Sequence, residues 1–277
     1  MLNINKESAK KVWGATPAGS AFGEGANIGT KEFFENVIKK RSSYEMPWLK
    51  EVIPFKTSRN KKVLELGCGA GYDAYEFCRH GADYTGIDIT PENIQRTKKH
   101  LSFFNYQPAI LEGDAEVLNF DNQIFDIVYS NGVLHHTPNI SKSFNEAFRV
   151  LKNGGFFWVI VYHKNSIFYR ISLFLTDHLL KLGFLKRSFK ERVSMMEYTT
   201  SNKLPLVNAY SRKEVRNLLE NAGFMVKSLQ VRKLVSDDLP IIPLLSRLWK
   251  YIPQSWLDYV GRRFGWYVIA KAEKPIN

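Results

Sequence analysis

Between Lys61 and Tyr162 the sequence repeats one pattern, in which a short apolar segment is followed by a segment with helical spacing. Short apolar segments bounded by turn residues are typical of buried strands. Because strands and helices alternate, the chain is predicted to form a parallel sheet with helices on both faces, a doubly wound α/β fold. The expected strands are 61–66, 84–88, 109–112, 125–129 and 156–162, and the expected helices are 72–80, 91–104 and 141–151.

The alternation breaks at 163–210 and then resumes with a helix at 211–222 and strands at 224–231 and 266–272. Hydrophobic residues make up 44% of the chain, enough for a packed core of this size. Thr30 is a suitable N-cap for a helix that carries Phe33, Phe34, Val37 and Ile38. The predicted division of the chain is an N-terminal lid or helical segment at 1–55, a core at 56–165 and 211–277, and a helical cap insertion at 166–210.

The first strand runs directly into three glycines at alternate positions, Gly67, Gly69 and Gly71, and a helix follows. This context is typical of nucleotide binding. The dinucleotide fingerprint requires a third glycine at position 72, where Tyr72 stands, and the Gly-Lys-Ser/Thr of a phosphate-binding P-loop is absent. The pattern therefore indicates a close backbone approach to a ligand other than a pyrophosphate.

Acidic residues stand in or after the first three strands, at Glu65, Asp88 and Asp114. A carboxylate inside an apolar strand is costly without a partner, and a phosphate would repel it. Asp88 is placed to accept both hydroxyls of a ribose, and Asp114 to accept from an exocyclic amine. Each acid alone is more often a loop cap, but together they favour a nucleoside that carries a positive charge.

Five segments in this order resemble the class I S-adenosylmethionine-dependent methyltransferases, above all the small-molecule branch that includes quinone and sterol methyltransferases. They are VLELGCGAGYDA, TGIDIT, EGDAEVLNF, FDIVYSNGVLHHTPN and RVLKNGGFFWVIVY. The resemblance covers about residues 61–162. It implies a Rossmann-like, doubly wound, seven-stranded sheet whose last strand is antiparallel, which agrees with the strand expected at 266–272. It implies S-adenosylmethionine as the cofactor and S-adenosylhomocysteine as the product.

The resemblance also implies roles for residues around this cofactor. Gly67 and Gly69 would approach its methionine part, Asp88 would hold the ribose, and Asp114 with Ala115 would flank the adenine. Ser130-Asn131-Gly132 would border the sulfonium methyl group. No metal is expected. The full set of expected cofactor-binding residues is Glu65, Gly67, Cys68, Gly69, Gly71, Asp88, Ile89, Asp114, Ala115, Ser130 and Asn131.

Methyl transfer from a sulfonium is an in-line substitution in which positioning dominates, and a base is needed only where the acceptor must lose a proton. His135 and His136 follow the fourth strand and are candidates for that base, with His136 preferred; alternatively they shape the pocket floor or cap the next helix. Tyr162 and His163 are candidates to line the acceptor pocket.

Trp13, Tyr44 and Trp48 are aromatic residues near the glycine-rich segment 14–29, which is expected to be a mobile lid. They could close over cofactor and substrate, Trp13 being the one expected to bind substrate, or simply pack an N-terminal helix on the core.

Three functions stay open at this stage. The first is a methyltransferase for a small-molecule acceptor of apolar or anionic character. The second is a nucleic-acid-binding methyltransferase, suggested by the charge distribution, since 1–150 is balanced and 151–277 carries the whole net charge of +12. No Asn-Pro-Pro-Tyr-type run follows the fourth strand, which argues against nucleic acid bases as the acceptor. The third is a non-catalytic nucleoside-binding protein of the same fold.

The insertion contains a segment, 164–192, with an apolar stripe and six Lys and Arg residues between Arg170 and Arg192. It is predicted to cap the acceptor pocket, with a basic flank that contacts an anionic membrane surface; the alternative is an ordinary helix on the sheet edge. Two cysteines, no signal-peptide pattern and no long apolar run lead us to expect a cytoplasmic protein. The stripe is Ile171, Phe174, Leu175, Leu179 and Leu182.

Overall fold

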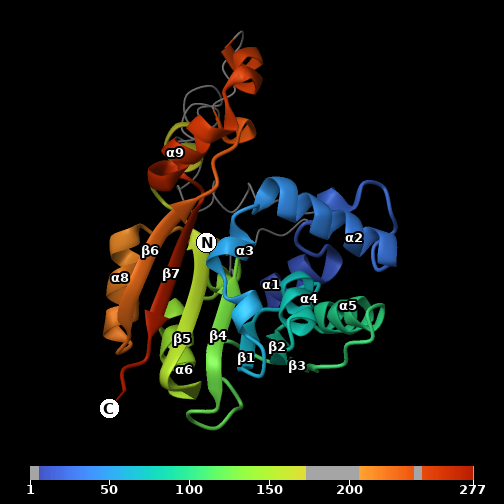
Figure 1. Cartoon of the computed structure of the whole chain (residues 1–277), viewed down its shortest axis with the longest axis vertical. Coiled ribbons are helices and arrows are strands. Elements are labelled where there is room, and N and C mark those ends of the chain that lie inside the picture. The colour runs from blue at the N-terminus through green and yellow to red at the C-terminus, as the bar shows by residue number, and fades with distance from the viewer. Residues whose placement is uncertain (1–5, 173–205, 240–244, 277) are drawn as a thin grey trace.

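A computed structural model describes residues 6–172, 206–239 and 245–276 of the chain. Most of the predicted cap, 173–205, lies outside the described residues, and so do all residues of its apolar stripe except Ile171. Within the described parts of the chain, no helix is long and apolar enough to cross a membrane. Figure 1 shows one twisted sheet with helices packed on both of its faces.

The sheet has seven strands in the order β3-β2-β1-β4-β5-β7-β6, which confirms the predicted fold class. Strands β1 to β5 pair in parallel, and β7 runs antiparallel to both of its neighbours, β5 and β6. The strands are β1 (Lys62–Leu66), β2 (Asp83–Asp88), β3 (Ala109–Glu112), β4 (Phe125–Asn131), β5 (Leu151–Tyr162), β6 (Met225–Arg232) and β7 (Tyr267–Glu273).

Strand order reverses at β1, which has β2 on one side and β4 on the other. In open parallel sheets the crevice at such a switch point, at the carboxyl ends of the strands, is the usual place for a ligand. The register brings Glu65 of β1 beside Gly86 of β2 and Tyr129 of β4. The glycine stretch that follows β1 is therefore placed at the mouth of this crevice.

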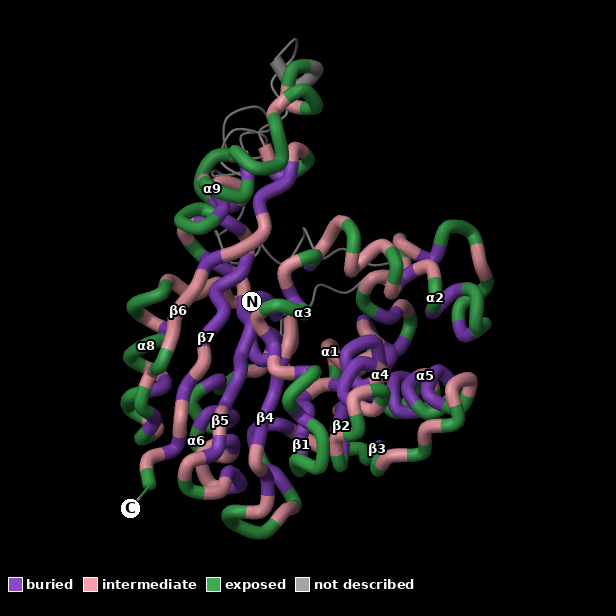
Figure 2. The backbone as a smooth tube through the Cα atoms, viewed as in Figure 1, coloured by how far each residue is buried: buried purple, intermediate pink, exposed green. Residues whose placement is uncertain are grey.

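Helices on the two faces of the sheet bury separate hydrophobic clusters, and Figure 2 shows the buried strands between them. One face packs on α6 and α8, and the other packs on α3, α4 and α5. The α-helices are α1 (Lys6–Ala15), α2 (Lys31–Lys40), α3 (Leu49–Val52), α4 (Tyr72–Arg79), α5 (Pro91–Ser102), α6 (Ile140–Val150), α8 (Arg212–Asn221) and α9 (Gln254–Phe264).

Short 3-10 or π turns connect these elements. They are η1 (Ser20–Gly23), η2 (Arg41–Glu45), η3 (Phe55–Thr57), η4 (Leu134–His136), η5 (Phe168–Ser172), η8 (Ser236–Asp238) and η9 (Leu245–Tyr251). The predicted cap on α2 is confirmed, because Thr30 accepts a hydrogen bond from the Phe33 backbone N–H at 3.2 Å. Phe33, Phe34 and Val37 are buried on this helix, and the Phe34 ring stacks on His100 of α5.

Strand β5 begins earlier than the sequence predicts. Its first residue is Leu151, and Asn153-Gly154-Gly155, expected to separate helix from strand, lies inside it. Gly154 has a φ of +75°, and its N–H donates to the Lys274 carbonyl oxygen at 2.8 Å. The glycines thus make the start of β5 irregular, and the hydrogen bond to Lys274, near the end of the chain, holds this part of the strand in place.

Candidate functional site

A cavity of about 560 Å³ lies at the carboxyl ends of β1, β2 and β4. Its walls come from three places: the strand ends, the N-terminal segment and the turn η2. The segment from Thr16 to Ala21 and the indole of Trp13 form one wall. The cavity therefore lies between the sheet and the N-terminal segment, where the switch in strand order predicts a ligand.

The three glycines after β1 all have positive φ but serve different purposes. A Cβ on Gly67 would lie 2.5 Å from Val133 Cγ1, and one on Gly71 would lie 2.9 Å from Thr97 Cγ2. A Cβ on Gly69, by contrast, would meet nothing within 4 Å, and Gly69 lines the cavity. Packing therefore requires Gly67 and Gly71, whereas Gly69 leaves its space open to a ligand.

Asp88, at the end of β2, is a buried carboxylate on the cavity wall. It accepts hydrogen bonds from the backbone N–H of Gly69 at 2.9 Å, from that of Thr90 at 2.9 Å, and from Asn93 Nδ2 at 3.4 Å. Burial raises the pKa of Asp88, and these donors act in the opposite direction. A carboxylate offers about four acceptor positions, so this one is fixed in orientation and still able to accept from a ligand.

Asp114, after β3, also lines the cavity, and Lys6 of α1 is bound to it. The Lys6 ammonium lies 2.5 Å from Asp114 Oδ2 and 2.7 Å from Glu116 Oε2. This pairing ties the N-terminal helix to the loop after β3. Sequence reasoning missed Lys6, because nothing local links two residues 108 positions apart.

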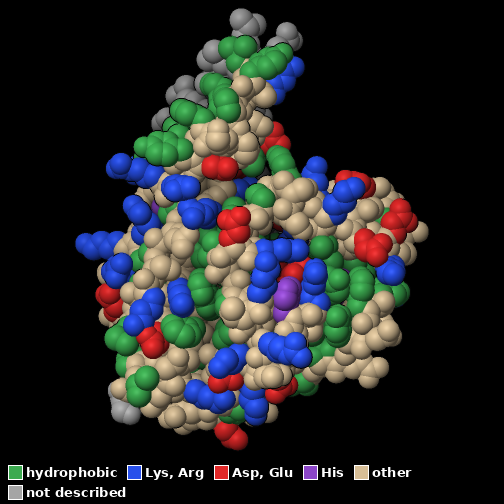
Figure 3. All heavy atoms as spheres, in the orientation of Figure 1, with side chains coloured by type: hydrophobic (Ala, Val, Ile, Leu, Met, Phe, Trp, Pro, Cys, Tyr) green, Lys and Arg blue, Asp and Glu red, His purple; other side chains and the backbone are tan. Residues whose placement is uncertain are grey.

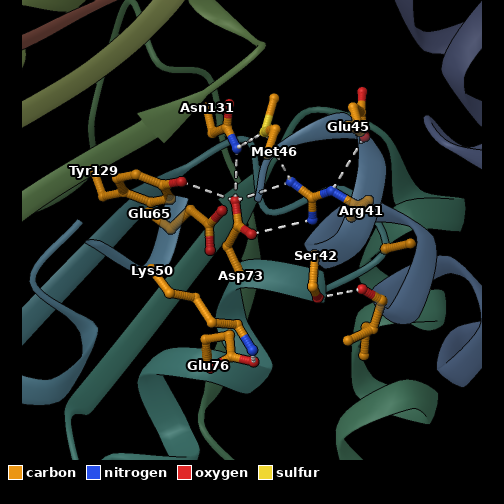
Figure 4. A network of polar contacts seen from close by, with 12 residues as sticks. Arg41, Ser42, Glu45, Met46, Lys50, Glu65, Asp73, Glu76, Tyr129 and Asn131 are labelled. Carbon is orange, nitrogen blue, oxygen red and sulfur yellow. Dashed lines mark hydrogen bonds and ion pairs between the residues drawn. The ribbon is translucent and has the colours of Figure 1, made fainter. Parts of the chain in front are cut away.

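A network of buried polar groups closes the side of the cavity near η2 (Figure 4). Asp73 Oδ2 accepts from the Tyr129 hydroxyl and from Asn131 Nδ2, each at 2.9 Å. Arg41 Nη1 lies 3.1 Å from Asp73 Oδ1, and Arg41 Nε lies 3.6 Å from Glu45. Burial opposes the charge on Arg41, but the two carboxylates outweigh it and raise the pKa of the guanidinium. The pairing with Arg41 holds the Asp73 carboxylate in a fixed orientation inside the protein.

Glu65 points into the same region from β1 (Figure 4). It accepts a hydrogen bond from the Tyr84 hydroxyl. Burial, with the charge of Asp73 nearby, raises the pKa of the Glu65 carboxyl well above its ordinary value. A cation in the cavity would favour the ionised form of Glu65, so the site is electrostatically suited to a positively charged ligand.

His136 lines the cavity, and its ring centroid lies 5.1 Å from that of Trp13. Its Nδ1 lies 2.6 Å from the carbonyl oxygen of Leu206. A carbonyl oxygen only accepts, so Nδ1 carries the proton, and Nε2 is the acceptor nitrogen of the neutral ring.

His135 does not line the cavity. It is fully buried, its ring centroid lies 3.9 Å from that of Tyr162, and burial lowers its pKa well below the ordinary value. Among the described residues, neither ring nitrogen of His135 has a hydrogen-bond partner. The structure thus places His135 behind Tyr162, where its ring packs on the tyrosine and does not face the cavity.

The cavity brings together most of the residues that the sequence singles out. The lining includes Glu65, Gly67, Cys68, Gly69, Asp88, Ile89, Asp114, Ala115, Asn131, His136, Trp13 and Tyr162. Three other predicted residues face elsewhere besides His135. The Ser130 hydroxyl donates to the Leu66 carbonyl inside the sheet, His163 Nδ1 lies 3.0 Å from the Gly265 carbonyl oxygen, and Gly71 packs on Thr97.

Tyr44 and Trp48, for which closing over the ligand and packing on the core were both left open, also lie outside the cavity lining. The Tyr44 hydroxyl donates to Asp237, and Trp48 packs on Tyr267. Sequence reasoning also missed several lining residues, among them Arg41, Met46, Asp73 and Tyr267. Asp73 stands inside the glycine stretch, so that motif could have indicated it; the others reach the cavity only through tertiary packing.

The charges of the lining residues limit what the cavity can hold. Its acidic residues outnumber its two cations, Lys6 and Arg41, and both cations are already paired with carboxylates. A phosphate would therefore be repelled, whereas a nucleoside with a positive charge would be attracted. In the described parts of the chain, no group of three or more His, Cys, Asp and Glu residues could hold a metal ion. The acidic lining residues are Glu45, Glu65, Asp73, Asp88 and Asp114.

Comparison with known protein families gives a match to the family described as "Methyltransferase domain" over residues 64–159. The rat mitochondrial ubiquinone biosynthesis O-methyltransferase is 27% identical over 152 residues, covering 52% of this chain and 41% of the relative. The sterol 24-C-methyltransferase of Debaryomyces hansenii is 25% identical, covering 73% and 49%. A phthiotriol/phenolphthiotriol dimycocerosates methyltransferase of Mycobacterium leprae is 37% identical, covering 34% and 35%. The matches span less than half the length of these relatives.

Solved structures show the same fold at low sequence identity. A methyltransferase from Methanosarcina mazei, described as S-adenosylmethionine-dependent, superposes with a TM-score of 0.55 at 18% identity, covering 79% of this chain and 94% of that one. One from Mesorhizobium loti superposes with a TM-score of 0.54 at 17% identity, covering 83% and 97%. At such identities the likeness establishes the arrangement of strands and helices.

Proposed function

We propose that this chain, whose residues 64–159 match a methyltransferase domain, transfers a methyl group from S-adenosylmethionine to a small-molecule acceptor. The observation that carries the proposal is the acid-lined cavity at the switch point of the sheet, with the open space over Gly69 and the oriented carboxylate of Asp88. S-adenosylmethionine supplies a methyl group on a positively charged sulfur that carries its own leaving group.

The residues of the cavity fit this cofactor. Asp88 would accept hydrogen bonds from the ribose hydroxyls, and Asp114 with Ala115 would border the adenine. Gly69, over which the space is open, would let the backbone approach the methionine part, whereas Gly67 borders the cavity but is required by its packing on Val133. Asn131 is placed to hydrogen-bond a ligand, because its Oδ1 is buried and has no partner among the described residues, while its Nδ2 is held by Asp73.

The sign of the charge supports a sulfonium. Glu45, Glu65 and Asp73 are the carboxylates in the wall nearest η2, and the burial of Glu65 makes its charged form depend on a nearby cation. A positive sulfur would be attracted to this wall, and the neutral product would be attracted less. The site would therefore bind S-adenosylmethionine more tightly than S-adenosylhomocysteine. This difference favours replacement of the product by new cofactor.

The acceptor is proposed to be apolar at the part that enters the cavity. Trp13, Met46, Tyr162 and Tyr267 form an apolar and aromatic section of the lining. Such surfaces bind flat or hydrophobic groups by burial and leave orientation to a few polar atoms. The names of the quinone and sterol relatives agree with an acceptor of this class. Positioning and exclusion of water by these side chains would supply most of the catalysis.

His136 is the residue we propose as general base for an acceptor that must lose a proton. It lines the cavity, and its Nδ1 donates to the Leu206 carbonyl oxygen, which orients the ring. Proton abstraction of this kind contributes about 10²- to 10⁴-fold in rate. His135 is not proposed for this role, because its ring is buried outside the cavity lining.

The proposal is tested by product formation. The purified chain would be incubated with a small-molecule extract and S-adenosylmethionine labelled in the methyl group, and products would be identified by mass spectrometry. We expect labelled small molecules together with S-adenosylhomocysteine, and a loss of both with Asp88→Ala. Cofactor binding without any labelled product, across extracts of apolar and anionic metabolites, would instead favour a nucleoside-binding protein without transferase activity.

A further inference from the structure

Exposed hydrophobic side chains concentrate in one short part of the molecule. Of the eleven large hydrophobic residues exposed in the described parts of the chain, five lie between Leu248 and Phe264. Three of these five are Trp or Tyr. Figure 3 shows hydrophobic side chains gathered over η9 and α9, with Lys and Arg side chains beside them. Exposed hydrophobic side chains concentrated in this way are typical of an interaction site. The five residues are Leu248, Tyr251, Trp256, Tyr259 and Phe264, and we call them the aromatic face.

The orientation of α9 keeps part of this face turned away from the protein. Leu257 and Gly261 are buried, and a Cβ on Gly261 would lie 3.1 Å from Leu234 Cβ, so this side of the helix packs closely on the segment after β6. Successive helical residues are about 100° apart, which places Trp256, Tyr259 and Arg263 on a stripe roughly opposite to Leu257 and Gly261. Trp256 is 54% exposed and Tyr259 is 75% exposed.

Most charged residues within the segment that carries the aromatic face are positive. The segment 245–264 contains four Lys and Arg residues and one acid, Asp258. Asp258 accepts a hydrogen bond from Gln254 at 2.9 Å. Two of the cations lie beside aromatic rings of the face: Lys250 Nζ is 5.0 Å from the Tyr251 centroid, and the Arg263 guanidinium carbon is 5.4 Å from the Phe264 centroid. The surface therefore combines aromatic rings with unbalanced positive charge.

We infer that the aromatic face docks on an anionic membrane surface. Trp and Tyr have an apolar body and a polar edge, and they favour the headgroup level of a bilayer. Arg and Lys beside them are attracted to anionic lipid. A second copy of the chain is the competing occupant of this surface, and the light-scattering test below separates it from a membrane. The inference does not require the chain to be a methyltransferase.

The docking surface is directly connected to the cavity. The segment that carries it joins Arg232, at the end of β6, to Tyr267, the first residue of β7 and a lining residue of the cavity. Trp266 stacks on Phe168 with ring centroids 4.1 Å apart and contacts Tyr162, another lining residue, at 5.9 Å. The segment that carries α9 is thus joined to the cavity wall through Trp266 and Tyr267.

Vesicle sedimentation with the full chain tests the inference. Wild-type protein would be mixed at low salt with vesicles of phosphatidylcholine alone, or of phosphatidylcholine with phosphatidylglycerol. We expect binding to the mixed vesicles, weaker binding to neutral ones, and a decline as salt is added. Absence of binding to the mixed vesicles at low salt would overturn the inference.

Two pairs of variants test whether vesicle binding depends on the aromatic face itself, and not on exposed hydrophobic or positively charged side chains anywhere on the protein. Trp256→Ala/Tyr259→Ala should bind mixed vesicles at least about tenfold more weakly, while Ile28→Ala/Val117→Ala, which removes two other exposed hydrophobic side chains, should bind like wild type. Arg262→Ala/Arg263→Ala should bind about thirty-fold more weakly, since each cation near an anionic surface contributes about a factor of five. Lys213→Ala/Arg216→Ala, with the same loss of charge on α8, should bind nearly as well as wild type.

An equal loss of binding to the mixed vesicles in both variants of either pair would refute the inference. Light scattering provides the remaining check. If the wild-type chain is a dimer and Trp256→Ala/Tyr259→Ala is a monomer, the aromatic face is a self-association surface and membrane docking is wrong. If the oligomeric state is the same in both while vesicle binding differs, the inference stands.

Discussion

Arg41 and Asp73 form a buried ion pair, with Arg41 Nη1 3.1 Å from Asp73 Oδ1, that joins the N-terminal segment to the first turn of α4 (Figure 4). Tyr129 and Asn131, from β4, donate to the same carboxylate. Three elements that are distant in the sequence, η2, α4 and β4, thus meet at one acid beside the cavity. This relationship fixes the turn η2, and with it Glu45 and Met46, as part of the cavity wall.

Removal of one partner of this pair should be strongly destabilising, because the other charge stays buried without compensation. We expect Asp73→Ala to lower the free energy of unfolding in urea by about 3–5 kcal/mol. The double variant Arg41→Ala/Asp73→Ala should lose less than the sum of the single variants, with a coupling of about 1–3 kcal/mol. As a control, Glu35→Ala removes the exposed pair with Lys31 at 3.8 Å and should change stability by about 0.5 kcal/mol or less. Strict additivity would show that the pair is not coupled.

Gly69 and Gly67 should respond differently to a methyl group. Gly67→Ala would place its Cβ 2.5 Å from Val133 and should lower the unfolding free energy markedly, by about 2 kcal/mol or more. Gly69→Ala meets nothing within 4 Å, so it should cost only the strain of positive φ, about 1 kcal/mol, while its Cβ enters the ligand space. Calorimetric titration with S-adenosylhomocysteine should show about tenfold or greater weakening for Gly69→Ala. An unchanged affinity would mean that the ligand does not approach this glycine.

The buried ring of His100 should make stability depend on pH. Burial lowers its pKa to about 4, from the ordinary value of 6.5. Between these values the unfolded chain binds a proton and the folded chain does not, so stability falls as the pH falls from 6.5 towards 4. The loss attributable to His100 is about 3 kcal/mol at most. Urea unfolding across this range should show a shallower decline for His100→Gln than for wild type. Parallel curves would place the pH dependence elsewhere.

The predicted lid at 14–29 contributes a wall of the cavity, from Thr16 to Ala21. Ligand that fills the cavity should therefore suppress opening of this segment. Hydrogen exchange followed by mass spectrometry should slow by about tenfold or more in 14–29 when S-adenosylhomocysteine is saturating. Peptides from α8, which packs on the opposite face of the sheet, serve as the internal control and should not change. Equal exchange with and without ligand would make this segment an ordinary loop.

Much of the fold could be predicted because local patterns and tertiary structure agree. Each strand between Lys61 and Tyr162 is a short apolar run, and each begins or ends within a few residues of its expected bounds except the start of β5. There, Gly154-Gly155 has the composition of a loop, but pairing with the chain end recruits it to the strand. Glu65, Asp88 and Asn131 line the cavity because they stand at or near the carboxyl ends of strands that the sequence predicts.

Contacts between segments that are distant along the chain could not be predicted from the sequence. Lys6 reaches Asp114, and Tyr267 reaches the cavity, only because β7 and α1 are placed by the whole fold. His135 and His136 are adjacent and chemically equal, and the turn η4 alone decides that His136 lines the cavity. Tyr44 and Trp48 likewise had the right composition for a lid, but their partners, Asp237 and Tyr267, come from the other end of the chain.

Calorimetric titration of S-adenosylmethionine into wild-type protein and Asp88→Ala is the most direct test that the cavity is a cofactor site. Asp88 accepts from the backbone N–H groups of Gly69 and Thr90, so Asp88→Ala loses these hydrogen bonds together with the acceptor for the ribose, and circular dichroism serves to show that the variant is folded. We predict saturable binding at one site in wild type, and an affinity weaker by about 1.5–3 kcal/mol in Asp88→Ala. No binding to the wild-type chain, or equal affinity in the folded variant, would contradict the account.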